Sequence, residues 1–290
     1  MHSKLVCILL ACLLGCGMAA AQTVADSTKA AAQDEDFVRV SLVTIGPGNE
    51  VYSLYGHTAL RLQCPPHGLD YCFTFEMALR PEEELKFFFS TAKAGFIAAK
   101  TDLFFANYRT KGRSITEQQL NLRPTEEQQL WRMLDQEMAK GAHWDYSFLT
   151  TNCSSMCIWM VEKALATEGE KIVYNRLPEA VGGTYRDLLN HISHDAPWAR
   201  LFWNIRMGSK GSEQGAVNDK LAPALLQEAW ADAVISDTSG NVRPVFAGAP
   251  RHIAPQQFRV APAPITPTMA LVIAIILVTT ILLFIKRKKR

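Results

Sequence analysis

A cysteine that follows an asparagine, in the segment FLTTNCSSMCIWM at residues 148–160, could act as a nucleophile. Thr150, Thr151 and Asn152 are good helix-capping residues, so we expect Cys153 at the start of a helix. The free N–H groups and the positive dipole end of a helix start favour a thiolate over a thiol. A single helical cysteine is usually a small buried hydrophobic residue, so the nucleophile hypothesis depends on a base elsewhere in the chain.

His57 is the best candidate for that base, because it follows Gly56 at the head of the predicted strand HTALRLQC. A cysteine at a helix start that faces a histidine on a strand is the papain-type arrangement, and the Cys153 backbone N–H could help to hold an oxyanion. Here the histidine precedes the cysteine, which is the order found in circularly permuted papain-like enzymes. The other histidines downstream of residue 21 lie in less suggestive places, in a turn, before the cysteine helix, near a helix end or in a linker: His67, His143, His191, His194 and His252.

A third polar group should orient the imidazole of His57. The strands HTALRLQC and DYCFTFEM are joined by the turn segment PPHGL, and their pairing as a hairpin would bring residues near 74–76 beside His57. Thr74 and Glu76 share one face of the second strand, so both are candidates for this role.

Four cysteines lie downstream of residue 21, which is too few for a disulfide scaffold in an exported domain. Cys64 and Cys72 flank the PPHG turn and could form a disulfide across the hairpin. Cys153 and Cys157 are one helical turn apart, which is a poor geometry for a disulfide. Cys157 is expected to be a core residue.

Sequence patterns around these residues indicate the strands and helices that position them. Together these elements predict an α+β fold, with an antiparallel sheet packed on helices. FVRVSLVTIGPG alternates and predicts a strand, whereas residues 82–107 are expected to be partly helical, with FFF at 87–89 in the core rather than in a lipid groove. The clearest helix is RPTEEQQLWRMLDQEMAKG, with a capping box of Thr125 and Gln128. TYRDLLNHI and NDKLAPALLQEAWADAVI predict two more helices. The helix after Asn152 presents a core-facing stripe of Cys153, Met156, Cys157, Met160, Val161 and Ala164.

The N-terminus has the features of an export signal over residues 1–21. Lys4 precedes the apolar run LVCILLACLLG, and AAAQ offers a cleavage site after Ala21. The segment LLGC also resembles a lipobox, which would make Cys16 a lipidated first residue. Residues 22–36 are small and polar and predict a flexible leader to a domain at residues 37–237.

A second hydrophobic segment, TMALVIAIILVTTILLFI at residues 268–285, predicts a membrane-spanning helix. The basic tail KRKKR at residues 286–290 follows at once and is expected in the cytoplasm. Residues 238–267 are rich in Pro, Gly and Ala and predict a linker. We therefore expect a periplasmic domain attached to the bacterial inner membrane by one helix.

Composition restricts the function further. The formal net charge is +2 and the last five residues are all basic, so the domain itself lacks the basic stripe of a nucleic-acid-binding protein. With 48% hydrophobic and 20% charged residues, the chain does not have the composition of a disordered protein. We expect no cofactor and no metal site, and the sequence leaves the oligomeric state open.

The segments YSLYGHTALRL, GRSITEQQLNL, YSFLTTNC and GTYRDLL occur in this order within residues 38–235. Together they resemble the lipoprotein N-acyltransferase (Lnb) domain family of bacterial membrane proteins. The resemblance implies a permuted papain-like fold and an acyl transfer in which a thiolate takes a fatty acyl chain from a lipid or lipoprotein ester and passes it to an amine. It assigns the chemistry to Cys153 and His57, and it makes Arg61 a substrate-binding candidate, with a surface salt bridge as the alternative.

Two other functions stay open at this point. One is a papain-like cell-wall peptidase or amidase, and the other is a non-catalytic binding module on the same fold. The predicted membrane helix and the aromatic content favour an acyl substrate, and the sequence contains no internal repeat of the kind that binds the cell wall. A long apolar groove that ends at Cys153 would favour acyl chains, whereas a polar open cleft would favour peptides.

Overall fold

The computed structural model describes residues 38–77, 92–141 and 143–288. Within them, seven strands form one antiparallel sheet in the order β10-β5-β1-β2-β3-β4-β6. The predicted signal segment, the leader and the FFF run at 87–89 lie outside the described residues. The strands of the sheet are β1 (Arg39–Ile45), β2 (His57–Cys64), β3 (Leu69–Met77), β4 (Lys93–Lys100), β5 (Ile115–Gln119), β6 (Trp144–Asp145) and β10 (Arg251–Ala254).

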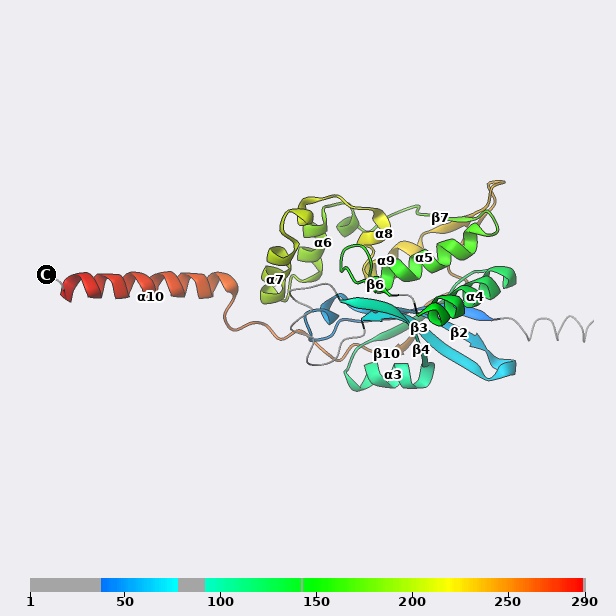
Figure 1. The fold of residues 1–290 in the computed structure, drawn as a ribbon, viewed down its shortest axis with the longest axis horizontal. Helices are drawn as coiled ribbons and strands as arrows, with labels where there is room; N and C mark the ends of the chain where they lie inside the picture. The colour runs from blue at the N-terminus through cyan, green and yellow to red at the C-terminus, as the bar shows by residue number, and fades with distance from the viewer. Residues whose placement is uncertain (1–37, 78–91, 142, 289–290) are drawn as a thin grey trace, which may run out of the picture.

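Helices cover both faces of this sheet (Figure 1). The α+β class with an antiparallel sheet is therefore confirmed. Alternate residues of the strands face opposite layers, so Leu42, Leu60 and Phe73 belong to one core cluster and Val43 and Ala59 to another. One layer contains α4 (Pro124–Lys140), α5 (Cys153–Ala166) and α9 (Pro223–Ala231), and the opposite layer is α3 (Thr101–Thr110).

Two helix predictions are wrong in detail, and proline is the reason for both. Pro124 occupies the first turn of α4, where its missing N–H has no consequence, and the side chain of Glu126 accepts a hydrogen bond from the Arg123 N–H at 2.7 Å. The capping residues are therefore Arg123 and Glu126, not Thr125 and Gln128. Pro223 interrupts the helix predicted over NDKLAPALLQEAWADAVI. The chain forms α8 (Val217–Lys220), α9 and the strand β8 (Val234–Ser236) there instead.

The segment predicted as a linker from residue 238 belongs in part to the folded domain. A small second sheet contains β7 (Lys171–Val173), β8 and β9 (Val242–Pro244). The chain then returns to the main sheet, where β10 pairs antiparallel to β5 at its edge. Val245 and Phe246 are buried between these strands. The folded domain therefore reaches Ala254, and only the residues after it can connect it to α10 (Pro267–Lys288).

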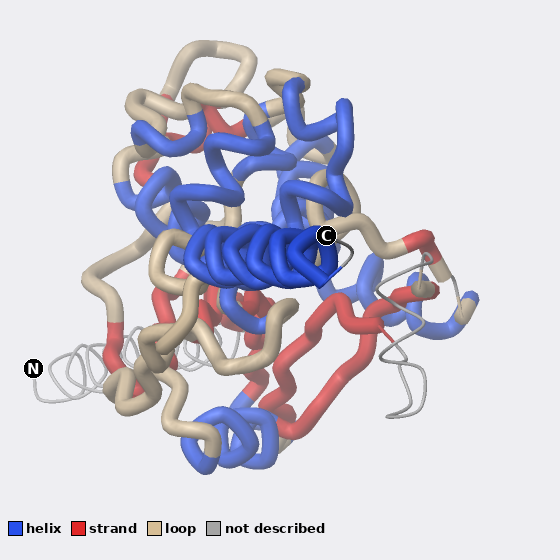
Figure 2. The backbone as a smooth tube through the Cα atoms, turned by 90° about the vertical axis from the view of Figure 1, so that its left-hand side faces the viewer, coloured by secondary structure: helices blue, strands red, loops and turns tan. Residues whose placement is uncertain are grey.

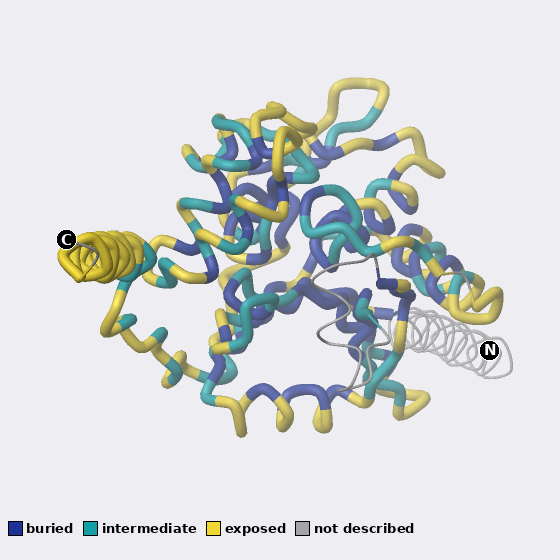
Figure 3. The backbone as a smooth tube through the Cα atoms, turned by 60° about the vertical axis from the view of Figure 1, so that its left-hand side comes forward, coloured by how far each residue is buried: buried dark blue, intermediate teal, exposed yellow. Residues whose placement is uncertain are grey.

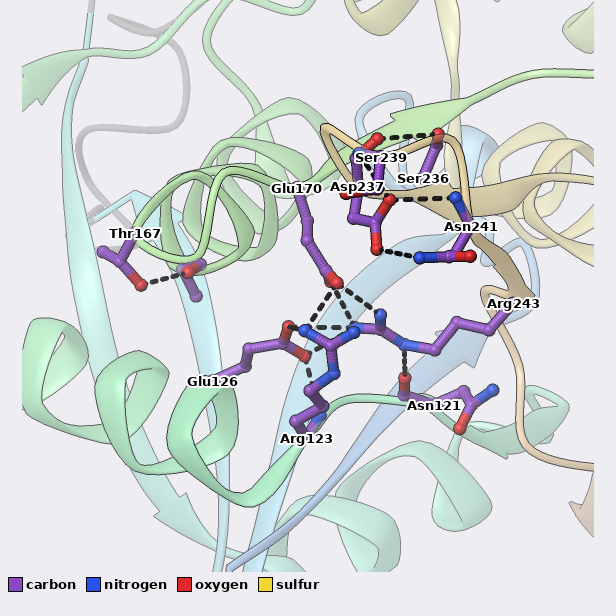
Figure 4. Close-up of polar contacts among 11 residues, drawn as sticks. Asn121, Arg123, Glu126, Thr167, Glu170, Ser236, Asp237, Ser239, Asn241 and Arg243 are labelled. Atoms are coloured by element: carbon purple, nitrogen blue, oxygen red, sulfur yellow. Dashed lines mark hydrogen bonds and ion pairs between the residues drawn. The ribbon is translucent and has the colours of Figure 1, made fainter.

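A group of buried charges joins the second sheet to α4 (Figure 4). The side chains of Glu126 and Glu170 are fully buried, and the guanidinium of Arg243 on β9 contacts both. Its Nη1 donates to Glu170 at 2.8 Å and its Nη2 donates to Glu126 at 2.8 and 2.9 Å. Arg123 also pairs with Glu170, at 2.7 Å. Arg243 thus neutralises two carboxylates that would otherwise repel each other.

Replacing Arg243 by methionine should lower the free energy of unfolding by about 3 kcal/mol, because it leaves buried carboxylates without their main partner. Thermal or urea unfolding of the full-length protein in detergent measures this loss. Lys93→Met is the matched control, since the Lys93–Asp145 pair is exposed on both sides, and it should change stability very little. Equal losses in the two variants would contradict a structural role for the Arg243 pairs.

The C-terminal helix α10 projects from the domain, as Figures 1 and 2 show. Among the described residues it is the helix that is long and apolar enough to cross a membrane. None of its described residues is buried, and the helix is exposed from Leu271 onward, where Figure 3 draws it in yellow. A core helix would be covered by the domain, so this exposure supports a membrane-spanning helix.

Candidate active site

Cys153 is the first residue of α5, as predicted from its neighbours. Asn152 is the N-cap, and its Oδ1 accepts hydrogen bonds from the backbone N–H groups of Ser154 at 3.0 Å and Ser155 at 3.1 Å. The hydroxyl of Ser155 accepts in return from the Asn152 N–H at 2.9 Å. This reciprocal cap fixes the first turn and leaves the Cys153 N–H pointing out of the helix start, beside the thiol.

His57 begins β2, and the glycine before it makes this position possible. Gly56 has φ +82°, in the left-handed region, and a Cβ there would lie 2.6 Å from the carbonyl oxygen of Ile45. A residue with a side chain would push β2 away from β1. Phe104 and Tyr108 of α3 pack beside the imidazole, with ring centroids at 6.4 and 6.1 Å.

Both predicted third groups reach the imidazole. The register of β2 and β3 pairs Ala59 with Thr74, which brings Glu76 opposite His57. The Nε2 atom of His57 lies 2.5 Å from Thr74 Oγ1 and 3.2 Å from Glu76 Oε1. Because these oxygens engage Nε2, the other ring nitrogen is left for Cys153.

The electrostatics of the pair favour charge separation. Burial alone would raise the pKa of the Cys153 thiol, but the charge and hydrogen bond of His57, the Thr58 N–H and the Ser154 hydroxyl outweigh burial and lower it. Burial likewise lowers the pKa of His57, but the charges and hydrogen bonds of Cys153 and Glu76 raise it to about 9. Both pKa shifts therefore favour the thiolate–imidazolium form of the pair over the neutral form. Cys157 lacks such partners, and burial raises the pKa of its thiol.

A cavity of about 480 Å³ opens beside this pair, and Cys153, His57, Thr74 and Glu76 all line it. Much of its wall is aliphatic or aromatic, whereas Arg113 and Lys111 bring positive charge to it. The apolar part of the wall consists of Phe75, Met77, Ile97, Ala99, Leu103, Phe104, Phe148, Leu188, Leu189, Ile192, Ala222 and Pro223. A chain of methylene groups would be accommodated by such a wall.

Arg61 does not line this cavity. Its guanidinium is buried and pairs with Asp70 of the neighbouring strand β3 at 2.6 Å and with Glu117 of β5, the strand beyond β1, at 2.9 Å. Neither predicted role describes this geometry, because Arg61 is neither a residue of the cavity nor part of a surface salt bridge. It instead joins three strands of the sheet beneath α3.

The disulfide considered between Cys64 and Cys72 is absent, and both cysteines are free and buried. The hairpin register explains why, since Cys64 pairs with Leu69 and Cys72 pairs with Arg61. The two cysteines are therefore not opposite each other. Cys72 contacts the Thr101 hydroxyl at 3.5 Å instead.

Arg113, Lys111 and Tyr108 are residues of the cavity that the sequence did not single out. Tyr108 belongs to α3, and the chain turns at Gly112 to bring Arg113 back over the Tyr108 ring at 4.8 Å. GRSIT contains Arg113, but nothing in the local pattern shows that this arginine is buried.

In the part of the chain that the structure describes, no group of three metal-binding side chains comes together.

The fold and the site together define an α+β domain with a cysteine and a histidine at the wall of a cavity that is apolar in part. The family model of the Lnb N-terminal periplasmic domain matches residues 26–190, which is more than half of the chain. The protein therefore belongs to this family. Searches of the curated proteins and of the solved structures give no significant match.

Replacing Glu76 by glutamine should lower the pKa of His57, because the variant removes the carboxylate charge that helps to raise it. The imidazolium of His57 should then lose its proton below about pH 9, where the wild-type ring loses it. The imidazolium fraction above pH 9 should fall by roughly an order of magnitude. NMR titration of the His57 ring measures this, and Thr74→Val, which removes no charge, should leave the midpoint in place. An unshifted midpoint in Glu76→Gln would contradict the coupling.

Proposed function

We propose that the protein is a membrane-tethered periplasmic thiol acyltransferase, which moves a fatty acyl chain from a lipid or lipoprotein ester to an amine. The observation that carries the proposal is the Cys153 thiol, whose pKa is lowered by His57, at the wall of a largely apolar cavity. We also infer a circularly permuted papain-like fold, since a strand histidine precedes a helix-start cysteine.

The first half-reaction forms a thioester. The thiolate of Cys153 attacks the carbonyl carbon of the donor ester, and the backbone N–H of Cys153 stabilises the oxyanion. The tetrahedral intermediate collapses when the carbon–oxygen bond of the ester breaks, and the imidazolium of His57 gives its proton to the leaving alcohol. Thr74 and Glu76 hold the ring in position through Nε2.

The second half-reaction transfers the chain. A neutral amine attacks the thioester carbonyl, and His57 takes the proton that the nitrogen loses. The carbon–sulfur bond breaks, the amide leaves, and the thiolate–imidazolium pair is restored. Each proton that His57 donates in the first half-reaction is thus recovered in the second, and no cofactor takes part.

The two alternatives fit these observations less well. A cell-wall peptidase or amidase needs a polar cleft for a glycan or peptide, whereas apolar side chains form more than half of the exposed wall beside Cys153. A binding module has no need of a thiol with a lowered pKa, because a thiolate is costly to bury. An acyl chain explains both features of the site.

The experiment that tests the function is mass spectrometry of lipoprotein N-termini in cells with and without the protein. With the active protein, the N-terminal amine should carry an amide-linked acyl chain. Cells that express Cys153→Ala should resemble cells without the protein. N-termini that are the same in all three strains would contradict the proposed transfer.

The proposed topology, with the domain in the periplasm and the basic tail in the cytoplasm, can be tested directly. Protease added to spheroplasts should digest the domain and spare a tag fused after Arg290. The physical reason is that the charged tail does not cross the bilayer once α10 is inserted. Digestion of that tag without permeabilisation would overturn this orientation.

A further inference from the structure

Arg113 has a buried charge on which Glu50 and the Cys153 thiolate act from a distance, without a direct ion pair among the described residues. Only 5% of the residue is exposed, its Nε donates to the Gly46 carbonyl at 2.8 Å, and its guanidinium stacks over Tyr108. Its Nη2 is buried and makes no hydrogen bond with any residue that the structure describes. An arginine stays protonated in a protein, so a positive group with a free donor lines the catalytic cavity.

The acidic side chains of the cavity are engaged elsewhere. Glu50 accepts from the Ser53 hydroxyl at 2.5 Å, Glu76 from His57, and Asp219 from the Tyr185 hydroxyl at 3.0 Å. The charge of Glu50 acts on Arg113, but the two side chains form no direct ion pair. Burying a charge without a direct partner is unfavourable, so an anionic group of a ligand would stabilise Arg113.

We propose that Arg113 binds the phosphodiester of a glycerophospholipid, and that this lipid is the acyl donor. The inference rests on the proposed function and specifies its donor. A glycerophospholipid carries its acyl esters and its phosphate on one glycerol, so a single molecule can offer a carbonyl to Cys153 and an anion to Arg113. The planar fork of arginine suits two phosphate oxygens, and the apolar wall takes the chain.

Binding can be measured without turnover. Full-length Cys153→Ala in detergent micelles is titrated with a diether phosphatidylglycerol, which has no ester to cleave. The double variant Cys153→Ala, Arg113→Met should bind this lipid about 10-fold or more weakly than Cys153→Ala alone. This is the loss expected for a charged hydrogen bond. A diether glycerol without phosphate should bind both proteins equally. Arg132→Met, which changes an exposed arginine outside the cavity, is the control and should bind like its parent.

The outcomes distinguish a failure of the donor assignment from a failure of the proposed function. Equal binding of the diether phospholipid with and without Arg113 overturns this inference, even if Cys153 proves to be acylated. Binding of glycerol 3-phosphate alone, as tight as that of the lipid, would assign the site to a free phosphate and also overturn it. Arg113-dependent lipid binding in a protein that never forms a thioester would preserve the phosphodiester site, but it would refute the proposed enzyme and the role of the lipid as donor.

A separate observation concerns α7 (Pro197–Met207). Trp198, Leu201 and Ile205 are exposed, and their spacing puts them on one side of the helix, with 49% of Trp198 and 71% of Ile205 accessible. The Trp198 Nε1–H donates to the Ile265 carbonyl at 2.7 Å, next to the start of α10. The apolar side of α7 therefore adjoins the membrane-spanning candidate (Figure 1).

We propose that this side of α7 lies in the lipid surface around α10. Its continuity with α10 favours a bilayer as the occupant, and tryptophan is the residue enriched at that depth. The basic Arg206 lies in the last turn of the helix and Lys210 in the 3-10 turn after it, and both would meet lipid phosphates. A second cavity, lined by Trp203 and Phe202 of α7, lies between this helix and the loop before Cys153 and shares Phe148 with the first.

Fluorescence quenching tests this placement in the full-length chain. Ile205→Cys in a Cys153→Ala background is labelled with a polarity-sensitive dye and reconstituted into liposomes that contain doxyl-labelled lipid. The dye should be strongly quenched, whereas a dye at Glu168→Cys, beyond the end of α5 that points away from α10, should not (Figure 1). Equal quenching at both sites would overturn the proposal. A dye emission that changes with protein concentration, and not with doxyl-labelled lipid, would also overturn it. That result would assign this side of α7 to a second copy of the chain.

Discussion

Cys153→Ala should abolish acyl transfer while leaving the fold intact. The expected loss is several orders of magnitude, because no other described thiol has both a lowered pKa and a position on the cavity wall. Incubation of the wild-type protein with a donor lipid should add one acyl group to its intact mass, and hydroxylamine should remove it. The added mass should be missing from Cys153→Ala.

Cys157→Ser is the matched control, since Cys157 lies one turn further along α5 and is fully buried in the core. It should still acquire the acyl group, although a hydroxyl in an apolar core costs about 1–3 kcal/mol of stability. Circular dichroism separates that loss from a loss of chemistry. Acylation of Cys153→Ala to the wild-type extent would mean that Cys153 is not the nucleophile.

His57→Ala should slow thioester formation by roughly 10²–10⁴-fold, the usual contribution of general acid–base catalysis. It should also change the thiol itself. Burial raises the pKa of Cys153 and His57 lowers it, so removing the histidine leaves burial unopposed. Alkylation by iodoacetamide, which needs the thiolate, should be rapid near neutral pH in the wild type and should require a higher pH in the variant.

A control for this experiment is His67→Ala, at the exposed turn that ends the same hairpin. Its alkylation profile and its rate of thioester formation should match those of the wild type. Should the alkylation profile of His57→Ala also match the wild type, the two residues would not form a coupled pair, and Cys153 would be better described as a core residue.

The parts of the fold that were predicted correctly depend on neighbours in the sequence. Alternation and a short turn are enough to pair β2 with β3, so Thr74 and Glu76 could be placed beside His57. Capping chemistry is equally local, and it placed Cys153 at a helix start. These signals are strong because each is complete within a few residues.

The parts that were missed depend on distant partners. β10 is short and lies in a segment rich in Pro, Gly and Ala, and it is a strand only because β5, far back in the chain, offers an edge. Arg61 can be buried because Asp70 and Glu117 both pair with it, and these two carboxylates come from two different strands. The burial of Arg113 likewise requires the packing of α3 against the sheet, which local patterns do not contain.

The route from β10 to α10 has a consequence for where substrates can be met. The backbone N–H groups of Gln257 and Phe258 both donate to the Gly112 carbonyl, and Ile265 is held by Trp198. Only residues 259–264 remain between these anchor points, a stretch that reaches about 20 Å at full extension. If α10 spans the bilayer as proposed, the folded domain is held close to the lipid surface. The proposed substrates would then arrive by lateral diffusion within the membrane plane, and an amine far above the lipid surface would be out of reach.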